Sequence, residues 1–139
     1  MGKPETIVRF RVRYSETDQM GTFYNSRALE WFELGRAELL RQIGLPYAEM
    51  EDEGVFLPLV EAHVEYKGRA RFDDELSMTV AAKMNGKASV RFDINIVHLG
   101  SQKPVTCGYT IHAVTDRLGK AVRPPAKLVE ALNRQGSGE

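Results

Sequence analysis

The stretch SRALEWFELGRAELLRQI, from Ser26 to Ile43, determines which fold the rest of the chain can adopt. Its apolar residues recur every three or four positions with charged residues between them, as on one face of an amphipathic helix. Asn25 or Ser26 is a suitable N-cap, and Gly44 followed by Pro46 is a normal stop signal. The spacing therefore predicts one long helix of about eighteen residues.

Strand patterns lie on both sides of this helix. Before it, between Ile7 and Tyr14, apolar residues alternate with arginines, as in a half-buried strand whose apolar side ends at Tyr14. After it comes a second, short helical stretch at about residues 47–53. Four further strand patterns follow at residues 56–66, 76–82, 90–96 and 105–113. The dipeptide Asn85-Gly86 is a two-residue hairpin signal between the second and third of these.

This order of elements indicates the fold class. One long helix must cover the apolar face of an antiparallel sheet, so the sheet should curl around it. We therefore expect an α+β domain, a five-stranded antiparallel sheet wrapped around one long central helix. The 139 residues fit a single domain, with a core at about residues 5–116 and a short C-terminal helix at about residues 125–135. The open sheet edges favour pairing with a second copy.

Composition narrows the class of protein. Nineteen basic residues balance nineteen acidic ones, which argues against a general nucleic-acid or polybasic membrane binder. No apolar run approaches the length of a membrane span, and the N-terminus has no apolar signal segment. The single cysteine, Cys107, cannot form an internal disulfide, which fits a reducing compartment. We therefore expect a cytoplasmic protein.

The histidines and the cysteine do not indicate a metal site. His63 and His112 fall opposite the apolar phase of their strands, so exposure or an interface is expected for both. Cys107 shares the phase of Val105 and Tyr109, which predicts a buried apolar thiol. No pair of histidines has helical ligand spacing, and we expect no bound metal.

The segment from Tyr14 to Asn25 carries the residues suited to chemistry. It places a carboxylate, Asp18, and a flexible Gly21 just before the long helix. The first N–H groups of a helix have no intrahelical partner and the helix dipole is positive there, so they can stabilise a thioester oxyanion. A nearby carboxylate can activate water or attack directly.

The same segment resembles the signature of the 4-hydroxybenzoyl-CoA thioesterase-like family of acyl-CoA thioesterases, also called YbgC-type. That family has a strand ending in Tyr, then Asp-x-x-Gly-x-x-Tyr, then a helix with an aromatic pair followed by Glu and Arg. The matching residues are Tyr14, Asp18, Gly21, Tyr24, Trp31-Phe32-Glu33 and Arg36. A second match runs from Tyr66 to Asp74-Glu75-Leu76, and the resemblance covers about residues 7–115.

The resemblance implies a hotdog fold and hydrolysis of an acyl- or aroyl-CoA to the free acid and CoA. It implies a homodimer or homotetramer with a site between protomers, and no cofactor beyond the CoA of the substrate. Asp18 matches the catalytic aspartate, and Tyr24 matches the residue whose backbone N–H polarises the thioester carbonyl. Gly21 belongs to the same substrate loop. Many relatives have His where this chain has Asn25, which is a candidate substrate contact.

Other interpretations remain open at this stage. Arg69 and Arg91 are candidates for binding the CoA phosphates, although most basic residues should be solvated. Asp18 could be an ordinary turn residue, and the Glu33–Arg36 spacing could give a simple ion pair on the helix surface. A non-catalytic acyl-CoA binding protein would keep the pocket without needing the carboxylate. An enoyl-thioester hydratase is disfavoured, because that class resembles Asp-x-x-x-x-His and this chain has Phe23 at that position.

Overall fold

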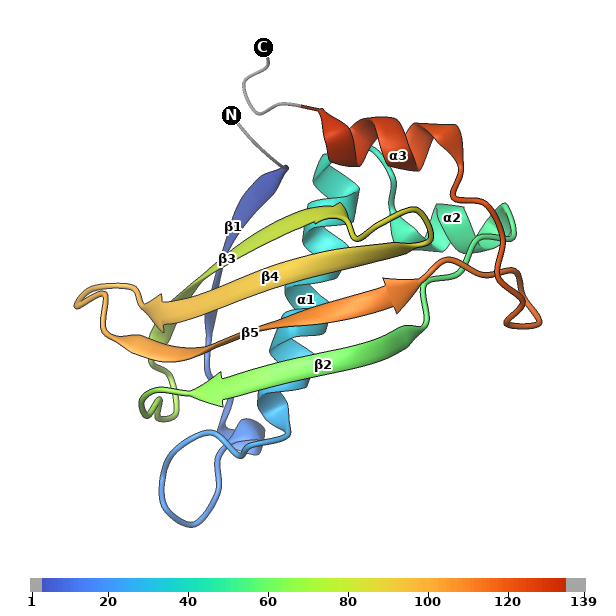
Figure 1. The fold of residues 1–139 in the computed structure, drawn as a ribbon. Helices are drawn as coiled ribbons and strands as arrows, with labels where there is room; N and C mark the ends of the chain where they lie inside the picture. Colours follow the sequence, from blue (N-terminus) through green and yellow to red (C-terminus); the bar gives the residue numbers. More distant parts are fainter. Residues whose placement is uncertain (1–3, 135–139) are drawn as a thin grey trace.

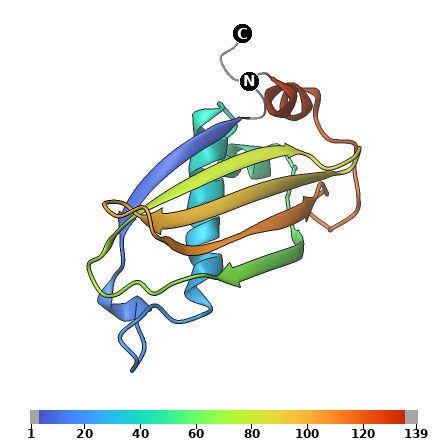
Figure 2. The same cartoon turned by 60° about the vertical axis from the view of Figure 1, so that its left-hand side comes forward.

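A five-stranded antiparallel sheet lies across one long helix in the computed structural model, which describes residues 4–134 (Figure 1). The sheet order is β1-β3-β4-β5-β2. The strands are β1 (Glu5–Arg11), β2 (Leu59–Tyr66), β3 (Glu75–Met84), β4 (Ser89–His98) and β5 (Pro104–Ala113). The helices are α1 (Arg27–Gln42), α2 (Tyr47–Asp52) and α3 (Ala126–Asn133), and a short 3₁₀ turn, η1 (Tyr14–Glu16), precedes α1. Turned by 60°, the sheet is seen to curl around α1 (Figure 2), which confirms the expected α+β architecture.

Helix α1 forms the centre of the core, as its spacing predicts. Its buried side is made by Ala28, Trp31, Phe32, Gly35, Leu39 and Leu40. Gly35 lets the helix approach the sheet closely, because a Cβ atom there would lie 2.6 Å from Val80 Cγ2 and 2.9 Å from Met78 Sδ. Ser26 occupies the N-cap position, but its side chain makes no capping hydrogen bond. The helix start is therefore fixed by packing and by backbone contacts of the preceding loop.

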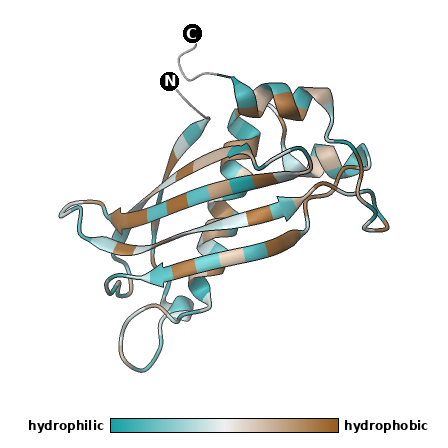
Figure 3. Cartoon of the chain, viewed as in Figure 1, coloured by the Kyte–Doolittle hydropathy of each residue, from teal (hydrophilic) through white to brown (hydrophobic). Residues whose placement is uncertain are grey.

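The two central strands have the faces that the sequence predicts. Alternate residues of β3 and β4 are fully buried toward α1, and the alternation is visible along the ribbon (Figure 3). These residues are Leu76, Met78, Val80, Ala82, Val90, Phe92, Ile94 and Ile96. The predicted hairpin follows β3, and Gly86 has a φ of +76°. The connection runs from residue 85 to residue 88 and is longer than the two-residue turn that the dipeptide suggests.

In strand β5 the face that points toward α1 is the one expected to point away from it. His112 pairs with Val90 and Thr110 pairs with Phe92, so these polar residues share the inward side of the sheet and are buried. Cys107 and Tyr109 are half-buried on the other side. The predictions of an exposed His112 and a buried Cys107 thiol are therefore wrong, because a one-residue change of phase exchanges the two faces of a strand. His63 is exposed, as predicted.

The ends and edges of the sheet differ in detail from the sequence pattern. β1 ends at Arg11, and Tyr14, expected on its apolar side, begins η1 with 76% of its surface exposed. β2 pairs only with β5 and is an edge strand whose Val60 is 61% exposed. α3 lies within the predicted C-terminal helix, whose last expected residue, Gln135, is outside the described residues.

Within residues 4–134 no helix combines the length and apolarity needed to cross a membrane.

Candidate functional site

The loop between η1 and α1 folds as a small hairpin. Thr17 and Phe23 form an isolated antiparallel bridge. Inside it, the Asp18 amide donates to the Thr22 carbonyl at 2.9 Å, and the Gly21 amide donates to the Asp18 carbonyl at 3.0 Å. Gly21 has a φ of +80°, a conformation that suits glycine because it has no Cβ. The hairpin thus holds Asp18 at the base of a tip that projects below the sheet (Figure 1).

The Asp18 carboxylate is half-buried and partly engaged. Its Oδ1 accepts a hydrogen bond of 2.9 Å from the Met20 amide, which is the geometry of an Asx turn. Its Oδ2 accepts none from the residues that the structure describes. One carboxylate oxygen therefore stabilises the turn, and the other is free to contact a ligand or water.

The amides at the start of α1 differ from the arrangement that the family resemblance implies. The Tyr24 amide donates to the Glu16 carbonyl at 2.8 Å, so this N–H is already used within the loop. The amides of Asn25 and Ser26 have no hydrogen-bond partner within the described range. They precede the first residue of α1 and lie at the positive end of its dipole. If an oxyanion binds here, the free donors are those of Asn25 and Ser26.

Residues 66–70, which connect β2 to β3, hold this loop in place. The Phe23 amide donates to the Ala70 carbonyl at 2.9 Å. Arg69 Nη2 donates to the Met20 carbonyl at 2.6 Å. The Tyr66 hydroxyl donates to the Asn25 carbonyl at 2.6 Å. The structure therefore brings Arg69 together with the Asp18 loop, and Tyr66 is a positioning residue whose hydrogen bond the sequence pattern did not reveal.

Arg91 lies elsewhere. It belongs to the face of β4 opposite α1, where its guanidinium is 3.0 Å from Asp93 Oδ1 and stacks at 4.0 Å from the centre of the Tyr109 ring. None of its contacts involves the loop that carries Asp18. The structure thus separates Arg91 from the other candidate site residues.

A buried carboxylate fixes η1 against α1. Glu16 Oε1 accepts from the Arg13 amide at 2.7 Å, and Oε2 accepts from Trp31 Nε1 at 3.1 Å and from Arg13 Nη2 at 3.0 Å. Burial opposes ionisation of Glu16, but these hydrogen bonds outweigh it and hold the pKa of Glu16 below its ordinary value. The sequence offered one signal for this role, an acidic residue three positions after Arg13 at the start of a turn.

The arrangement can support acyl transfer. It combines a carboxylate oxygen that is free for reaction, two amides without partners at a helix N-terminus, and a cation, Arg69, on one loop cluster. Across residues 4–134, no group of three or more His, Cys, Asp or Glu side chains is placed to hold a metal ion.

Comparisons with known proteins place the chain among thioesterase-like proteins. Residues 12–132 match the family model described as the thioesterase-like superfamily. The chain is 31% identical over 126 residues (91% of this chain and 96% of the other) to a protein of Aquifex aeolicus (strain VF5) named "Putative esterase". A stretch of 56 residues, 40% of this chain and 41% of the other, is 46% identical to the Bacillus subtilis (strain 168) protein named "Putative acyl-CoA thioesterase YneP". Among solved structures, a 1,4-dihydroxy-2-naphthoyl-CoA thioesterase from Synechocystis has a TM-score of 0.85, covering 91% of this chain and 94% of that one. The two sequences are 19% identical, so this similarity shows the shared fold alone.

Proposed function

Because the chain belongs to the thioesterase-like superfamily and has its hotdog fold, we propose that it hydrolyses an acyl- or aroyl-CoA thioester to the free acid and CoA. The observation that carries this proposal is that Asp18 lies in the loop leading into α1, where the Asn25 and Ser26 amides have no partner among residues 4–134. The names of the relatives, which include an acyl-CoA thioesterase, support the same substrate class.

In the proposed reaction the two amides and Asp18 have separate roles. The thioester carbonyl oxygen accepts hydrogen bonds from the Asn25 and Ser26 amides, which stabilise the oxyanion as it develops; one such donor typically contributes about 2.7–4 kcal/mol. Asp18 takes a proton from water as the water oxygen bonds to the carbonyl carbon. The carbon–sulfur bond then breaks, and the proton passes to the departing thiolate. Direct attack by Asp18, followed by hydrolysis of the acyl-enzyme, is the alternative route.

The remaining parts of the site receive roles in the same proposal. Gly21 allows the tight hairpin that presents Asp18. Arg69 contributes a cation beside the loop and could contact a CoA phosphate if it exchanged its bond to Met20. Arg91 would serve CoA only from a different face of the sheet. The proposed reaction needs no metal or redox cofactor, since CoA enters as part of the substrate. A chain with one cysteine and no disulfide suits the reducing cytoplasm, where we propose the enzyme acts.

A second candidate function is non-catalytic binding of acyl-CoA. The specific observation that favours it is the Asx turn, because a structural role for Asp18 would explain its presence without any chemistry. A hydratase finds no such support, since Phe23 is buried and packs 4.7 Å, centroid to centroid, from Trp31.

Release of free thiol from a panel of acyl-CoAs tests the proposed function. We expect release above the uncatalysed rate with at least one aliphatic or aromatic acyl-CoA, detected with a chromogenic thiol reagent. Tight binding of the same compounds without thiol release would favour the non-catalytic candidate. If the protein neither releases thiol nor binds these compounds, both candidate functions are contradicted.

We further propose that the chain assembles at least as a dimer through β2. This strand pairs only with β5, and three of its apolar side chains, Leu59, Val60 and Tyr66, are about half exposed or more. An exposed apolar edge strand presents unpaired backbone groups and apolar surface, both of which favour pairing with another strand. Tyr66 also contacts the Asp18 loop, so a partner at β2 would complete the wall of the site.

The assembly is expected to be visible in solution. Sedimentation velocity at micromolar concentration should give a species of at least twice the 15.6 kDa chain mass. Replacement of Val60 by Lys should shift the distribution toward the monomer, because it places a charge on the proposed edge. A wild-type protein that sediments only as the single chain would contradict the proposal.

A further inference from the structure

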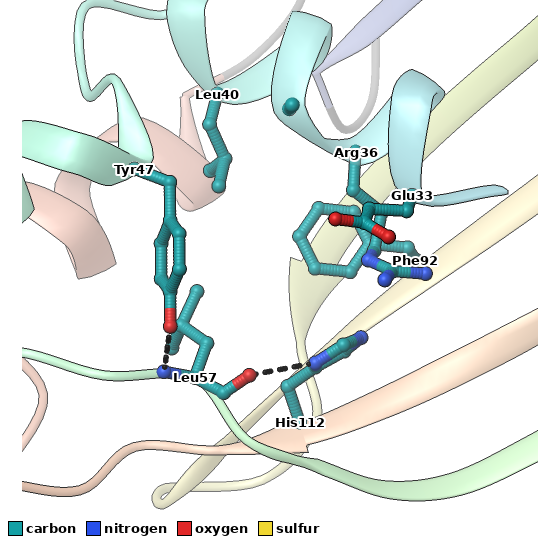
Figure 4. Close-up of a pocket in the computed structure, with 8 residues that line it drawn as sticks. Glu33, Arg36, Leu40, Tyr47, Leu57, Phe92 and His112 are labelled. Carbon is teal, nitrogen blue, oxygen red and sulfur yellow. Dashed lines mark hydrogen bonds between the residues drawn. The ribbon is translucent and has the colours of Figure 1, made fainter. Parts of the chain in front are cut away.

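A cavity separate from the Asp18 loop opens between α1, α2 and the strands β4 and β5 (Figure 4). Its volume is about 130 Å³. An apolar cavity of about 150 Å³ is large enough to bind benzene, so this space fits one ring or the end of an aliphatic chain. The side chains that line it include Glu33, Arg36, Tyr47, Leu57, Phe92 and His112.

Two charged side chains in this cavity, Arg36 and Glu33, have no hydrogen-bond partner among residues 4–134. The spacing left open a surface ion pair between Arg36 and Glu33, but the guanidinium has neither a hydrogen bond nor an ion pair among residues 4–134. It extends from α1 into the space that His112 enters from β5 (Figure 4). Burial lowers the pKa of Arg36, although Glu33 and Tyr47 act in the opposite direction. An arginine keeps its charge in proteins, so the guanidinium presents N–H donors that water or a ligand can accept.

No other polar group of the cavity accepts a hydrogen bond from Arg36, and the Glu33 carboxylate, which also lines the cavity, lies beyond ion-pair distance. His112 Nδ1 lies 2.9 Å from the Leu57 carbonyl and Nε2 lies 3.0 Å from Thr110 Oγ1, so both ring nitrogens are engaged. Burial, together with the charge of Arg36, lowers the pKa of His112 to about 4, and the ring is neutral near pH 7. The Tyr47 oxygen accepts from the Leu57 amide at 2.9 Å. The cavity therefore combines apolar walls with a guanidinium that makes no hydrogen bond to residues 4–134, and with the Glu33 carboxylate, which acts on it only through charge.

A stripe on α1 connects this cavity to the proposed reaction centre. Residues spaced three and four apart lie on one side of a helix. Such a series runs from the free amide at the helix start into the cavity: Ser26, Leu29, Glu33, Arg36 and Leu40. Leu29 is 39% exposed and offers apolar surface along the way. From Ser26 to Arg36 the helix rises about 15 Å, and because helical side chains lean toward the N-terminus the guanidinium lies nearer, at about 10 Å.

We propose that this cavity receives the far end of the acyl group, and that Arg36 selects acyl groups with an oxygen acceptor, above all a carboxylate, at that end. This inference rests on the proposed function, because it takes the thioester to lie at the N-terminus of α1. An extended chain advances about 1.2 Å per bond, so a span of about 10–15 Å corresponds to about eight to twelve bonds. A guanidinium matches a carboxylate through two parallel hydrogen bonds and a hydroxyl through one.

Three thioesters of equal chain length test the selection: octanoyl-CoA, 8-hydroxyoctanoyl-CoA and suberyl-CoA, the mono-thioester of octanedioic acid. For the wild type, kcat/KM should rise in that order. In Arg36→Met the ratio of suberyl- to octanoyl-CoA should fall about ten- to a hundred-fold, the value of one charge-assisted hydrogen bond, and the change should lie mainly in KM. Arg36→Lys should give an intermediate ratio. A ratio that changes less than about two-fold would overturn the inference.

Two controls separate this inference from folding and from catalysis. Arg41→Met removes an arginine of the same helix that pairs with Glu38 outside the cavity, and it should leave the ratio unchanged. Calorimetric binding of two thioether analogues, S-octyl-CoA and S-(7-carboxyheptyl)-CoA, measures the same discrimination without hydrolysis. If no thioester is hydrolysed, the proposed function fails, yet an Arg36-dependent preference for the carboxylated thioether would still support the cavity's role. Equal binding of both thioethers by wild type and Arg36→Met would refute it.

Discussion

Asp18→Asn is expected to lower kcat for thioester hydrolysis by about 10²–10⁴-fold, the usual contribution of a general base. The substitution keeps the size of the side chain, and the amide oxygen can still accept the Met20 N–H that forms the turn. What it removes is the charge and the basicity of the oxygen that has no partner in the loop. KM should change little, because the proposed contacts to the acyl group and to CoA come from other residues.

A matched control comes from a second aspartate in the same kind of turn. Asp116 Oδ1 accepts the amides of Leu118 and Lys120, each at 2.9 Å, in a loop apart from the proposed site. Asp116→Asn should therefore leave kcat unchanged. In single-turnover hydrolysis in ¹⁸O-water, label retained in Asp18 indicates nucleophilic attack, because water has added to the Asp18 carbonyl of the mixed anhydride. A base puts label only in the product acid and forms no acyl-enzyme. Full activity of Asp18→Asn would show that Asp18 only stabilises the turn and takes no part in the reaction.

Trp31→Ala is expected to destabilise the protein by about 3–5 kcal/mol, a large part of the total for a domain of this size. Trp31 is 2% exposed, and its ring centre lies 5.1 Å from that of Phe10 and 4.7 Å from that of Phe23. Removing the indole leaves a cavity between α1 and β1. It also removes one of the donors that compensate the buried Glu16 carboxylate.

The measurement is thermal or urea unfolding at one protein concentration, because assembly would make stability depend on concentration. Trp31→Ala should lower Tm by roughly 10 °C or more. Trp31→Phe keeps most of the apolar volume but loses the hydrogen bond to Glu16, so it should cost about 1–3 kcal/mol. A Tm for Trp31→Ala within about two degrees of the wild type would contradict the packing described for α1.

The sequence predicted well those elements that bury one face against a single partner. The long helix has an apolar stripe against the sheet, and β3 and β4 have one face toward that helix. In these elements the spacing of apolar residues therefore identifies the buried face. Strand β5 is different. Both of its alternating sets contain bulky or β-branched residues, and the inward set, with Thr110 and His112, meets a cavity as well as the core. Hydropathy therefore favoured the wrong set.

The site was predictable in part for a similar reason. The position of Asp18 before the helix follows from spacing along the chain. The state of the Tyr24 amide does not, because it depends on pairing between two sides of the loop that places Glu16 opposite. In the same way, the free guanidinium of Arg36 becomes apparent only when α1, α2 and β5 have enclosed a common space. Local sequence patterns contain no information on such contacts.

The hairpin that holds Asp18 has a consequence for the order of folding. It is attached to Arg69 and Ala70, about fifty positions later in the chain, and β1 pairs with β3 at a still larger separation, with Glu5 opposite Ala81. A nascent chain that has reached the end of α2 already contains the aspartate and all of α1, but none of these later anchors. Non-local pairing of this kind raises the contact order and slows folding, since the loops must close before the contacts form. The reactive geometry therefore arises late, with closure of the sheet, and an incomplete chain would carry the motif without the site.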